Sequence, residues 1–468
     1  MTEKTQRQIS FGEVLFVLLF LIGSLMATIM VFGGDPHMPI LATTVVAAIV
    51  AIRAGYKWED IQDGIIDGIK MSMQAVLILM IVGMIIGVWI LAGVVPTMIF
   101  YGLKILSPGI FLVATCLICS IVSLATGSSW TTAGTVGIAL LGVGVGLGMP
   151  LPMVAGAIIS GAYFGDKMSP LSDTTNLAPA MAGAELFDHI KHMIFTTGPS
   201  LVIALILYGI LGMRYAGQAL DVAGINELLG GLAGQFAINP LLFIPPLLVI
   251  LMVVFKIPAI PGLIGGVVLG GIFAAIFQGA GMGAIIDAAH YGFFSETGIE
   301  AIDDLLTRGG LDSMMWTVSL IIIAMSFGGT LEKTGMLNAL LEKILKGVKS
   351  TGSLVLATVL TSIFTNLTSG DQYMSLVVPG RMFKDAYAER GLHPKNLSRV
   401  LEDAGTLSSP LIPWNTCGAF MLSTLGVHPF AYLPFAFLNL LNPIISIFYG
   451  YTGITMEKLP QGKAEETA

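Results

Sequence analysis

The stretch GDKMSPLSDTTN, residues 165–176, places three charges and a proline in the middle of an otherwise apolar chain. A proline removes a backbone donor and interrupts a helix, and charges at membrane depth usually mark the path of an ion or a substrate. A related stretch, GTLSSPLIPWNT, occupies residues 405–416. Both begin with the pattern G-x-x-x-S-P-L, and their first glycines are 240 positions apart (405 − 165). The chain therefore carries two related polar breaks.

The composition around these breaks is that of an all-α polytopic membrane protein. Of 468 residues, 55% are hydrophobic and 11% are charged, and the mean hydropathy is +0.87, whereas a soluble domain carries about 25% charged residues. There is no basic tract, so nucleic acid is not an expected partner. Cys116 and Cys119 have no second pair that would complete a zinc site, and we interpret them as small buried helix residues.

Apolar runs of about 20 residues predict membrane-spanning helices, because that length crosses the hydrocarbon core. Such runs lie at roughly 12–32, 38–53, 72–92, 192–213, 238–255, 259–278, 313–331 and 429–451.

Four further segments are expected to be interrupted. The two motif stretches, about 150–178 and 400–422, are predicted to be broken helices. Segments 109–139 and 351–381 are apolar at both ends and polar in the middle, where they read ATGSSWTT and TNLTSGDQ. Each is too long for one straight span and too short for two, so a re-entrant hairpin with a polar tip is expected. Non-helical backbone at that depth must be buried in protein or line a wet cavity.

The two halves of the chain, residues 1–237 and 238–468, are predicted to be inverted repeats. Pro36 corresponds to Pro258 at an offset of 222 residues, whereas the polar motif repeats at an offset of 240. The extra stretch 279–312 explains why the second offset is larger. Each half then has five spans, namely three helices, a broken helix and one more helix. The hairpin is present in addition and is not counted as a span. An odd number of spans turns the second half upside down.

Lysine and arginine counts support this inversion, because short cytoplasmic loops are enriched in these residues. Loop 53–71 carries three of them, whereas its counterpart 279–312 carries only Arg308. Loop 93–108 carries only Lys104, whereas its counterpart in the second half carries four. We therefore expect a multi-pass protein of a bacterial-type plasma membrane, surrounded by lipid, with both termini in the cytoplasm.

Hairpin tips and broken helices that meet would form two pseudo-symmetric sites. Half-helix ends offer N–H groups to an anion and carbonyl groups to a cation, and a hard cation such as sodium prefers oxygen ligands. The first, a cation and proton site, would combine Thr126, Ser128, Ser129, Asp166, Ser169, Asp173 and Thr174. The second, for another cation or a substrate, would combine Asn366, Thr368, Ser369, Asp371, Glu402, Asp403, Ser409, Asn415 and Thr416.

Less specific interpretations remain open for these residues. The hydroxyl groups could serve only to satisfy the backbone of the broken helices. Lys167 could neutralise a carboxylate or bind an anionic substrate, and the neutralising pair is the preferred interpretation. Glu402 begins a predicted span and could lie at the membrane interface.

Asp166 and Asp173 are the residues predicted to couple sodium movement to proton movement. Seven positions correspond to about two turns of an unbroken helix, and the break at Ser169 and Pro170 can turn both carboxylates toward the first tip. Without sodium their repulsion would be severe, so at least one should be protonated, and sodium entry should expel that proton. The second site has Asn415 near the position of Asp173. It carries less charge there and is expected to hold a sodium ion or an organic anion.

The sequence favours secondary antiport over the other functional classes. It contains no H-E-x-x-H, G-x-S-x-G or P-loop pattern, so an enzyme is not expected, and no cofactor is expected beyond sodium and protons as coupling ions. The alternative in a different class is an ion channel, which needs a continuous pore with rings of ligands.

The motifs at residues 165–175 and 401–416 resemble those of the NhaC family of sodium/proton antiporters, within the ion transporter superfamily. The resemblance implies inverted repeats, two hairpins and an elevator-type transport unit that moves against a scaffold. We expect the hairpins and broken helices to form the unit, and the spans near 12–92 and 238–331 to form the scaffold.

Chain length suggests the branch of this family that resembles malate–lactate antiporters. Those would import malate with protons and export lactate with sodium, so small organic acids and ions are the expected substrates. Plain sodium/proton exchange is the alternative, and a homodimer is an open possibility for the assembly.

Overall fold

A computed structural model describes residues 6–216, 222–339 and 348–459. Within these ranges the chain is helical, with two isolated β-bridges and no strand. Eight of the described helices are long and apolar enough to cross a membrane, and two bent pairs of helices pass the same test together. The expected all-helical, polytopic architecture is therefore confirmed.

The first half of the chain begins with a pair of helices and a long third helix. Its helices are α1 (Phe11–Met26), α2 (His37–Arg53), α3 (Trp58–Leu91), α4 (Val94–Ile105), α5 (Pro108–Thr126), α6 (Ser129–Thr132), α7 (Ile138–Gly146), α8 (Leu151–Met168), α9 (Asp173–Ala182) and α10 (Leu186–Ala216).

The second half follows a similar order with two short helices, α14 and α15, inserted. Helix α11 (Val222–Gln235) precedes it, and its described helices are α12 (Ile244–Val254), α13 (Ala259–Gln278), α14 (Met282–His290), α15 (Glu300–Leu306), α16 (Met315–Lys333), α18 (Thr351–Ser369), α19 (Met374–Glu389), α20 (Pro394–Leu401), α21 (Thr416–Leu425), α22 (Pro429–Tyr432) and α23 (Phe437–Thr452).

Helix α3 begins earlier than the sequence predicted. The expected span 72–92 is only its second part, and most of the expected loop 53–71 is helical from Trp58 onward. The reason is a stripe of small or apolar residues, Ile61, Gly64 and Gly68, which are buried at helical spacing. Charged residues occupy the other faces, so this half of α3 looked like a loop by composition alone.

Both predicted hairpins are pairs of helices joined at their polar centres. In the first hairpin α5 ends at Thr126, and the returning arm runs from α6 through a π-helical turn to α7. Gly127 makes the turn with φ of +66°, a conformation that costs glycine little. Gly370, with φ of +69°, makes the turn between α18 and α19. The arms extend beyond the expected bounds, because the first hairpin covers Pro108 to Gly146.

Both predicted helix breaks are present. Helix α8 ends at Met168 and α9 begins at Asp173, so the break falls on the Ser-Pro pair. In the second half α20 continues as a π-helix (Glu402–Thr406) and a 3₁₀ turn (Ser409–Leu411) before α21 begins at Thr416.

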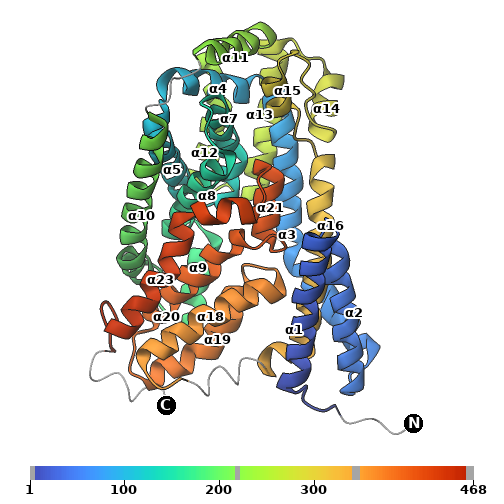
Figure 1. Ribbon diagram of the computed structural model, residues 1–468, viewed down its shortest axis with the longest axis vertical. Helices are drawn as coiled ribbons and strands as arrows, with labels where there is room; N and C mark the ends of the chain where they lie inside the picture. Colours follow the sequence, from blue (N-terminus) through green and yellow to red (C-terminus); the bar gives the residue numbers. More distant parts are fainter. Residues whose placement is uncertain (1–5, 217–221, 340–347, 460–468) are drawn as a thin grey trace.

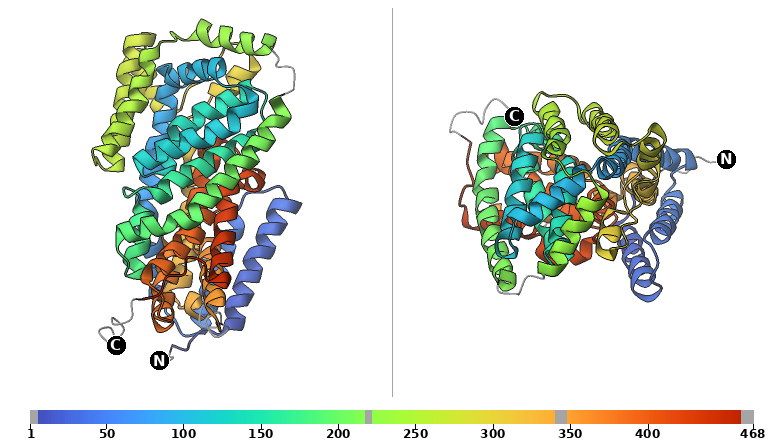
Figure 2. Two further views of the ribbon diagram at one scale, coloured as in Figure 1. Left: turned by 90° about the vertical axis from the view of Figure 1, so that its left-hand side faces the viewer. Right: turned by 90° about the horizontal axis from the view of Figure 1, so that it is seen from above.

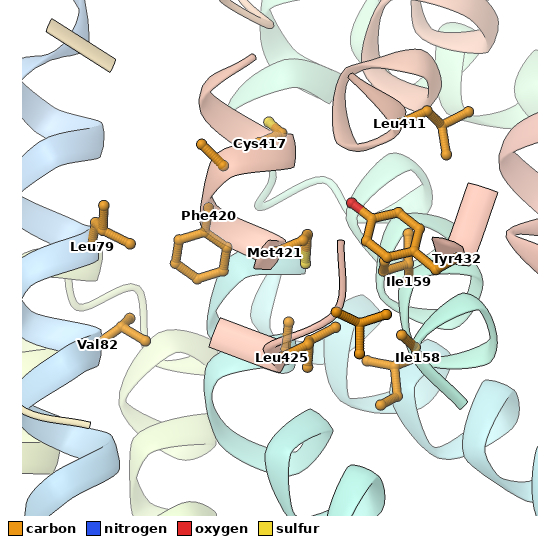
Figure 3. Packing of buried hydrophobic residues seen from close by; sticks show 14 of the residues in the cluster. Leu79, Val82, Ile158, Ile159, Leu411, Cys417, Phe420, Met421, Leu425 and Tyr432 are labelled. Atoms are coloured by element: carbon orange, nitrogen blue, oxygen red, sulfur yellow. The ribbon is translucent and has the colours of Figure 1, made fainter. Parts of the chain in front are cut away.

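Helices α3 and α16 lie side by side along the molecule, and α13 and α14 also pack on α3 (Figure 1). Helix α5 packs against α8 and α10 in a second group, and the view from above separates the α1–α2 pair from α10 (Figure 2). Between these groups lies α21, whose Phe420 faces Leu79 and Val82 of α3, while Leu425 approaches Ile158 of α8 (Figure 3). The second helix break therefore packs against both groups.

Glycines allow α3 and α16 to approach closely. A Cβ atom on Gly329 would lie 2.1 Å from the carbonyl oxygen of Gly64, and one on Gly68 would lie 2.3 Å from that of Met325. Backbone atoms cannot move aside as a flexible side chain can. Small residues that permit such contact are a general feature of helix packing in membranes.

We predict that Gly329→Ala destabilises the protein by about 1–3 kcal/mol, because the new methyl group overpacks the contact with α3. The measurement is the midpoint of thermal unfolding of the purified protein in detergent. Gly262→Ala in α13 is the matched control, since a Cβ there meets no atom within 4 Å. Equal midpoints for the two variants would contradict the prediction.

Candidate functional site

A cavity of about 440 Å³ lies where the first hairpin tip and the first helix break face α3 and the connection between α12 and α13. One wall is formed by Gln74, Ala75 and Ile78 of α3 and by residues 256–259. The other lining residues come from the two hairpin tips, the first helix break and the start of α21: Thr126, Gly127, Ser128, Ser129, Trp130, Thr131, Asp166, Pro170, Leu171, Ser172, Asp173, Thr174, Gln372, Tyr373, Thr416 and Cys417.

Asp166 is held against the first hairpin tip. Its carboxylate accepts hydrogen bonds from the Ser129 hydroxyl at 2.6 Å and from the Ser129 N–H at 3.2 Å. Gly165 makes this close approach possible, because a Cβ atom there would lie 2.2 Å from the backbone nitrogen of Leu124. Asp166 is buried, with 7% of the residue exposed, and it borders the cavity. Its remaining accepting capacity is available to a proton or a cation.

The other carboxylate of the break, Asp173, is exposed to the cavity at the start of α9. The Tyr373 hydroxyl of the second hairpin donates to it at 3.5 Å. The Ser-Pro break thus places Asp166 and Asp173 on one cavity, as the sequence suggested.

Hydroxyl groups at this break have a structural role as well. Thr175 donates to the carbonyl oxygens of Asp166 at 3.1 Å and of Lys167 at 2.9 Å, where α8 ends. Ser172 caps α9 by accepting the N–H of Thr175.

Six of the seven residues proposed for the first site line the cavity: Thr126, Ser128, Ser129, Asp166, Asp173 and Thr174. The seventh, Ser169, is fully buried behind the wall, and its hydroxyl accepts the N–H of Leu171 at 3.3 Å. The first set of residues is therefore gathered in space.

The residues proposed for the second site are not gathered on this cavity, apart from Thr416. Several hold the second break together. Asn366 donates to the carbonyl of Gly405 at 2.6 Å and accepts from Asn415 at 2.9 Å, and the carboxylate of Asp371 caps α19 at the N–H of Met374.

Three of the four hydroxyl groups of the second set donate to backbone carbonyls, while that of Thr416 donates to the side chain of Asn415. The three belong to Thr368, Ser369 and Ser409, and their acceptors lie three or four residues earlier in the chain. This matches the alternative in which hydroxyls serve the backbone of broken helices.

Lys167 forms an ion pair with Asp403, not with its neighbour Asp166. Both side chains are fully buried, and the Lys167 ammonium group also donates to Asn442 at 3.2 Å. Asp403 accepts a further hydrogen bond from Thr196 at 2.9 Å. The pair joins the first polar break to the second, and it leaves Lys167 out of the cavity.

Glu402, next to Asp403, lies inside the protein and not at an interface. It is 0% exposed, and neither of its carboxyl oxygens has a hydrogen-bond partner among the described residues. The sequence suggested an interfacial position because Glu402 begins an apolar stretch. The π-helical turn and the packing of α20 on α9 and α19 bury it instead.

Several lining residues were not proposed from the sequence, among them three polar residues of the second half. Tyr373 and Gln372 follow the second hairpin turn, and Cys417 accompanies Thr416 at the start of α21. Cys417 donates to the Gln372 side-chain oxygen at 2.6 Å. A signal was available for Gln372, which lies within the polar tip TNLTSGDQ, but none marked Cys417.

A helical chain with at least eight candidate spans, two hairpins and two broken helices around a polar cavity defines a polytopic membrane transporter. The family model described as the Na⁺/H⁺ antiporter family matches residues 161–454. The chain is 43% identical over 454 residues to the Na⁺/H⁺ antiporter NhaC of Alkalihalophilus pseudofirmus, covering 97% of this chain and 98% of that protein. It belongs to the NhaC-type Na⁺/H⁺ antiporter family.

Relatives with other names are almost as similar. The malate-2H⁺/Na⁺-lactate antiporter of Bacillus subtilis is 41% identical over 443 residues, covering 94% of this chain and 95% of that protein. The arginine/ornithine antiporter ArcD of Halobacterium salinarum is 39% identical over 467 residues, covering 99% and 96%.

We predict that Asp403→Asn destabilises the protein by about 3–5 kcal/mol, because it leaves the buried cations Lys167 and Arg399 without their shared partner. Lys167→Met should cost less, since Asp403 keeps Arg399 at 3.8 Å. The double variant should cost less than the sum of the two. Thermal unfolding of the three purified variants in detergent measures this coupling.

Lys395→Gln is the control for this cycle. Lys395 pairs with Glu457, whose side chain is 52% exposed, and such pairs contribute about 0–1 kcal/mol. Additive effects at Lys167 and Asp403 would show that the two charges do not stabilise each other.

Proposed function

We propose that this protein is a secondary antiporter that exchanges sodium for protons at the cavity beside the first helix break. The observation that carries the proposal is the pair of carboxylates, Asp166 and Asp173, on one cavity wall together with the hydroxyls of the first hairpin tip. Family membership supports the same activity.

Competition for the same oxygens is the proposed basis of exchange. Two carboxylates that face one poorly solvated cavity repel each other, so a proton on one of them relieves the repulsion. A sodium ion offers the same neutralisation through oxygen ligands, and its entry expels the proton. In each transport step the site therefore carries either a sodium ion or a proton across the membrane.

We further propose that the two halves, residues 1–237 and 238–468, are inverted repeats and that the hairpins and broken helices move together against a scaffold. The similar order of elements in the two halves supports this. The cavity lies between the two proposed parts, with α3 on the scaffold side and Asp166 on the moving side.

A second candidate is exchange of malate plus protons for lactate plus sodium. The cavity supports it, because about 440 Å³ lies within the range of small-molecule pockets, about 300–1,000 Å³. The similarity to the Bacillus subtilis malate-2H⁺/Na⁺-lactate antiporter also favours it. Counterflow of labelled malate and lactate in proteoliposomes, with and without a sodium gradient, tests this candidate.

We expect Asp166→Asn and Asp173→Asn to weaken sodium binding and to reduce the number of protons released per sodium bound. Isothermal titration calorimetry of the purified protein in two buffers of different ionisation enthalpy measures both quantities. Asp63→Asn is the matched control, since Asp63 is an exposed carboxylate on α3 outside the cavity. If both cavity variants keep wild-type affinity and proton release, the site assignment is wrong.

A cross-link between the two proposed parts should stop transport. The hydroxyls of Thr317 in α16 and Ser423 in α21 are in hydrogen-bond contact, so cysteines at these two positions are close enough to be joined. Sodium-driven proton flux of Thr317→Cys/Ser423→Cys in proteoliposomes should be lost on oxidation and restored by reductant.

Each single cysteine variant is the control for this experiment. Full flux after complete cross-linking would argue against a moving unit. Single-channel currents from the wild-type protein would favour a channel over a carrier.

A further inference from the structure

We propose that Lys256 forms a binding subsite for the carboxylate of a small organic anion, on the same cavity as Asp166. This inference rests on the proposed antiport function and extends it, because it assigns a residue and a ligand class to the scaffold side of the site. Lys256 lies in the connection between α12 and α13 and borders the cavity.

Among the described residues that line the cavity, Lys256 carries the positive charge, and Asp166 and Asp173 carry the negative charges. Its side chain is exposed and makes no ion pair within 4.0 Å in the described part of the chain. The other lysine near the site, Lys167, is already paired with Asp403. Lys256 is therefore the ammonium group that remains for a ligand.

The backbone at Lys256 is unusual. Its φ is +62°, and Thr455 is the other non-glycine residue with positive φ in the described ranges. This left-handed conformation costs an ordinary residue about 1–2 kcal/mol. Glycine would relieve that cost, as it does at sixteen other positive-φ positions. Lys256 ends α12 in this conformation, since the N–H of Ile257 donates to the carbonyl of Met252 at 3.0 Å. A lysine at this helix end, where glycine is the usual residue, places an ammonium group beside the cavity.

Three helices of ten or more residues begin on this cavity. They are α9 at Asp173, α13 at Ala259 and α21 at Thr416, and the first residue of each lines the cavity. The N-terminal end of a helix carries a partial positive charge. These ends add to the positive potential of Lys256, so the same cavity that holds a cation at its carboxylates also suits an anion.

The volume and the charges indicate the size and class of the anion. A cavity of about 440 Å³ is much larger than one cation needs. Lys256 and one bound sodium ion or proton together balance Asp166 and Asp173, so the carboxylate of a ligand keeps the cavity neutral when it enters with one further cation. Polar groups such as Gln372 and Ser128 then border the rest of the ligand. A short hydroxy acid or dicarboxylate matches these features.

The test compares Lys256→Gln, Lys256→Arg and the wild type in two assays. Binding of labelled lactate and malate to purified protein at saturating sodium should be saturable for the wild type. We expect Lys256→Gln to weaken it about tenfold or more, whereas Lys256→Arg keeps the charge and stays close to wild type. Lys191→Gln is the matched control, because Lys191 is an exposed lysine of α10 outside the cavity.

Sodium binding without any organic anion is the second assay. Removing a positive charge from the cavity should strengthen sodium binding in Lys256→Gln, whereas loss of folding would weaken it. This opposite change separates an electrostatic role in the site from a structural one.

Two results would overturn the inference. One is unchanged lactate and malate binding in Lys256→Gln, and the other is no saturable binding of either anion by the wild type. In both cases sodium-driven proton exchange by the wild type would leave the proposed antiport intact. Absence of that exchange, measured with a pH-sensitive dye in proteoliposomes, would overturn the antiport function instead.

Discussion

The buried ion pair between Lys167 and Asp403 is the interaction on which the arrangement of the two polar breaks depends. Both side chains are fully buried, and two unpaired charges in that environment would be prohibitively costly. The pair therefore requires that α8 and the start of the π-helix at Glu402 stay in contact. Successive residues of a helix point about 100° apart, so Asp166 can face the cavity while Lys167 holds the second half of the chain.

Many of the polar residues near the helix breaks form hydrogen bonds with backbone groups that have no partner within a helix. The end of α8 is closed by the Thr175 hydroxyl, and the N–H of Thr416 donates to the carbonyl of Gly370 at 2.8 Å. Trp414 donates from its indole to the carbonyl of Leu367. In an apolar surrounding these groups have no water to bond to. Asp166 and Asp173 differ from these groups because they border the polar cavity, which is why we propose them as the ion site.

The two breaks differ in a way that their shared motif conceals. The first break opens onto the polar cavity, whereas a second hollow of about 270 Å³, between α1 and the second hairpin, is lined almost entirely by apolar side chains such as Leu21 and Phe364. Asn415 caps α21 and binds Asn366, while Asp173, near the corresponding position, is exposed to the cavity. Of the second motif, Trp414 borders this apolar hollow and Thr416 borders the polar cavity.

The sequence alone determined the class of protein, most of the spans, the two hairpin turns and both helix breaks. These features follow from local chemistry, namely apolar length, glycine turns such as Gly127, and prolines such as Pro170. It also pointed to Asp166 and Asp173. Only the tertiary structure decided which partner Lys167 takes, that Glu402 is buried, and that Lys256 borders the same cavity as Asp166. These relations join residues that are distant in the chain, and their geometry follows from helix packing and not from local pattern.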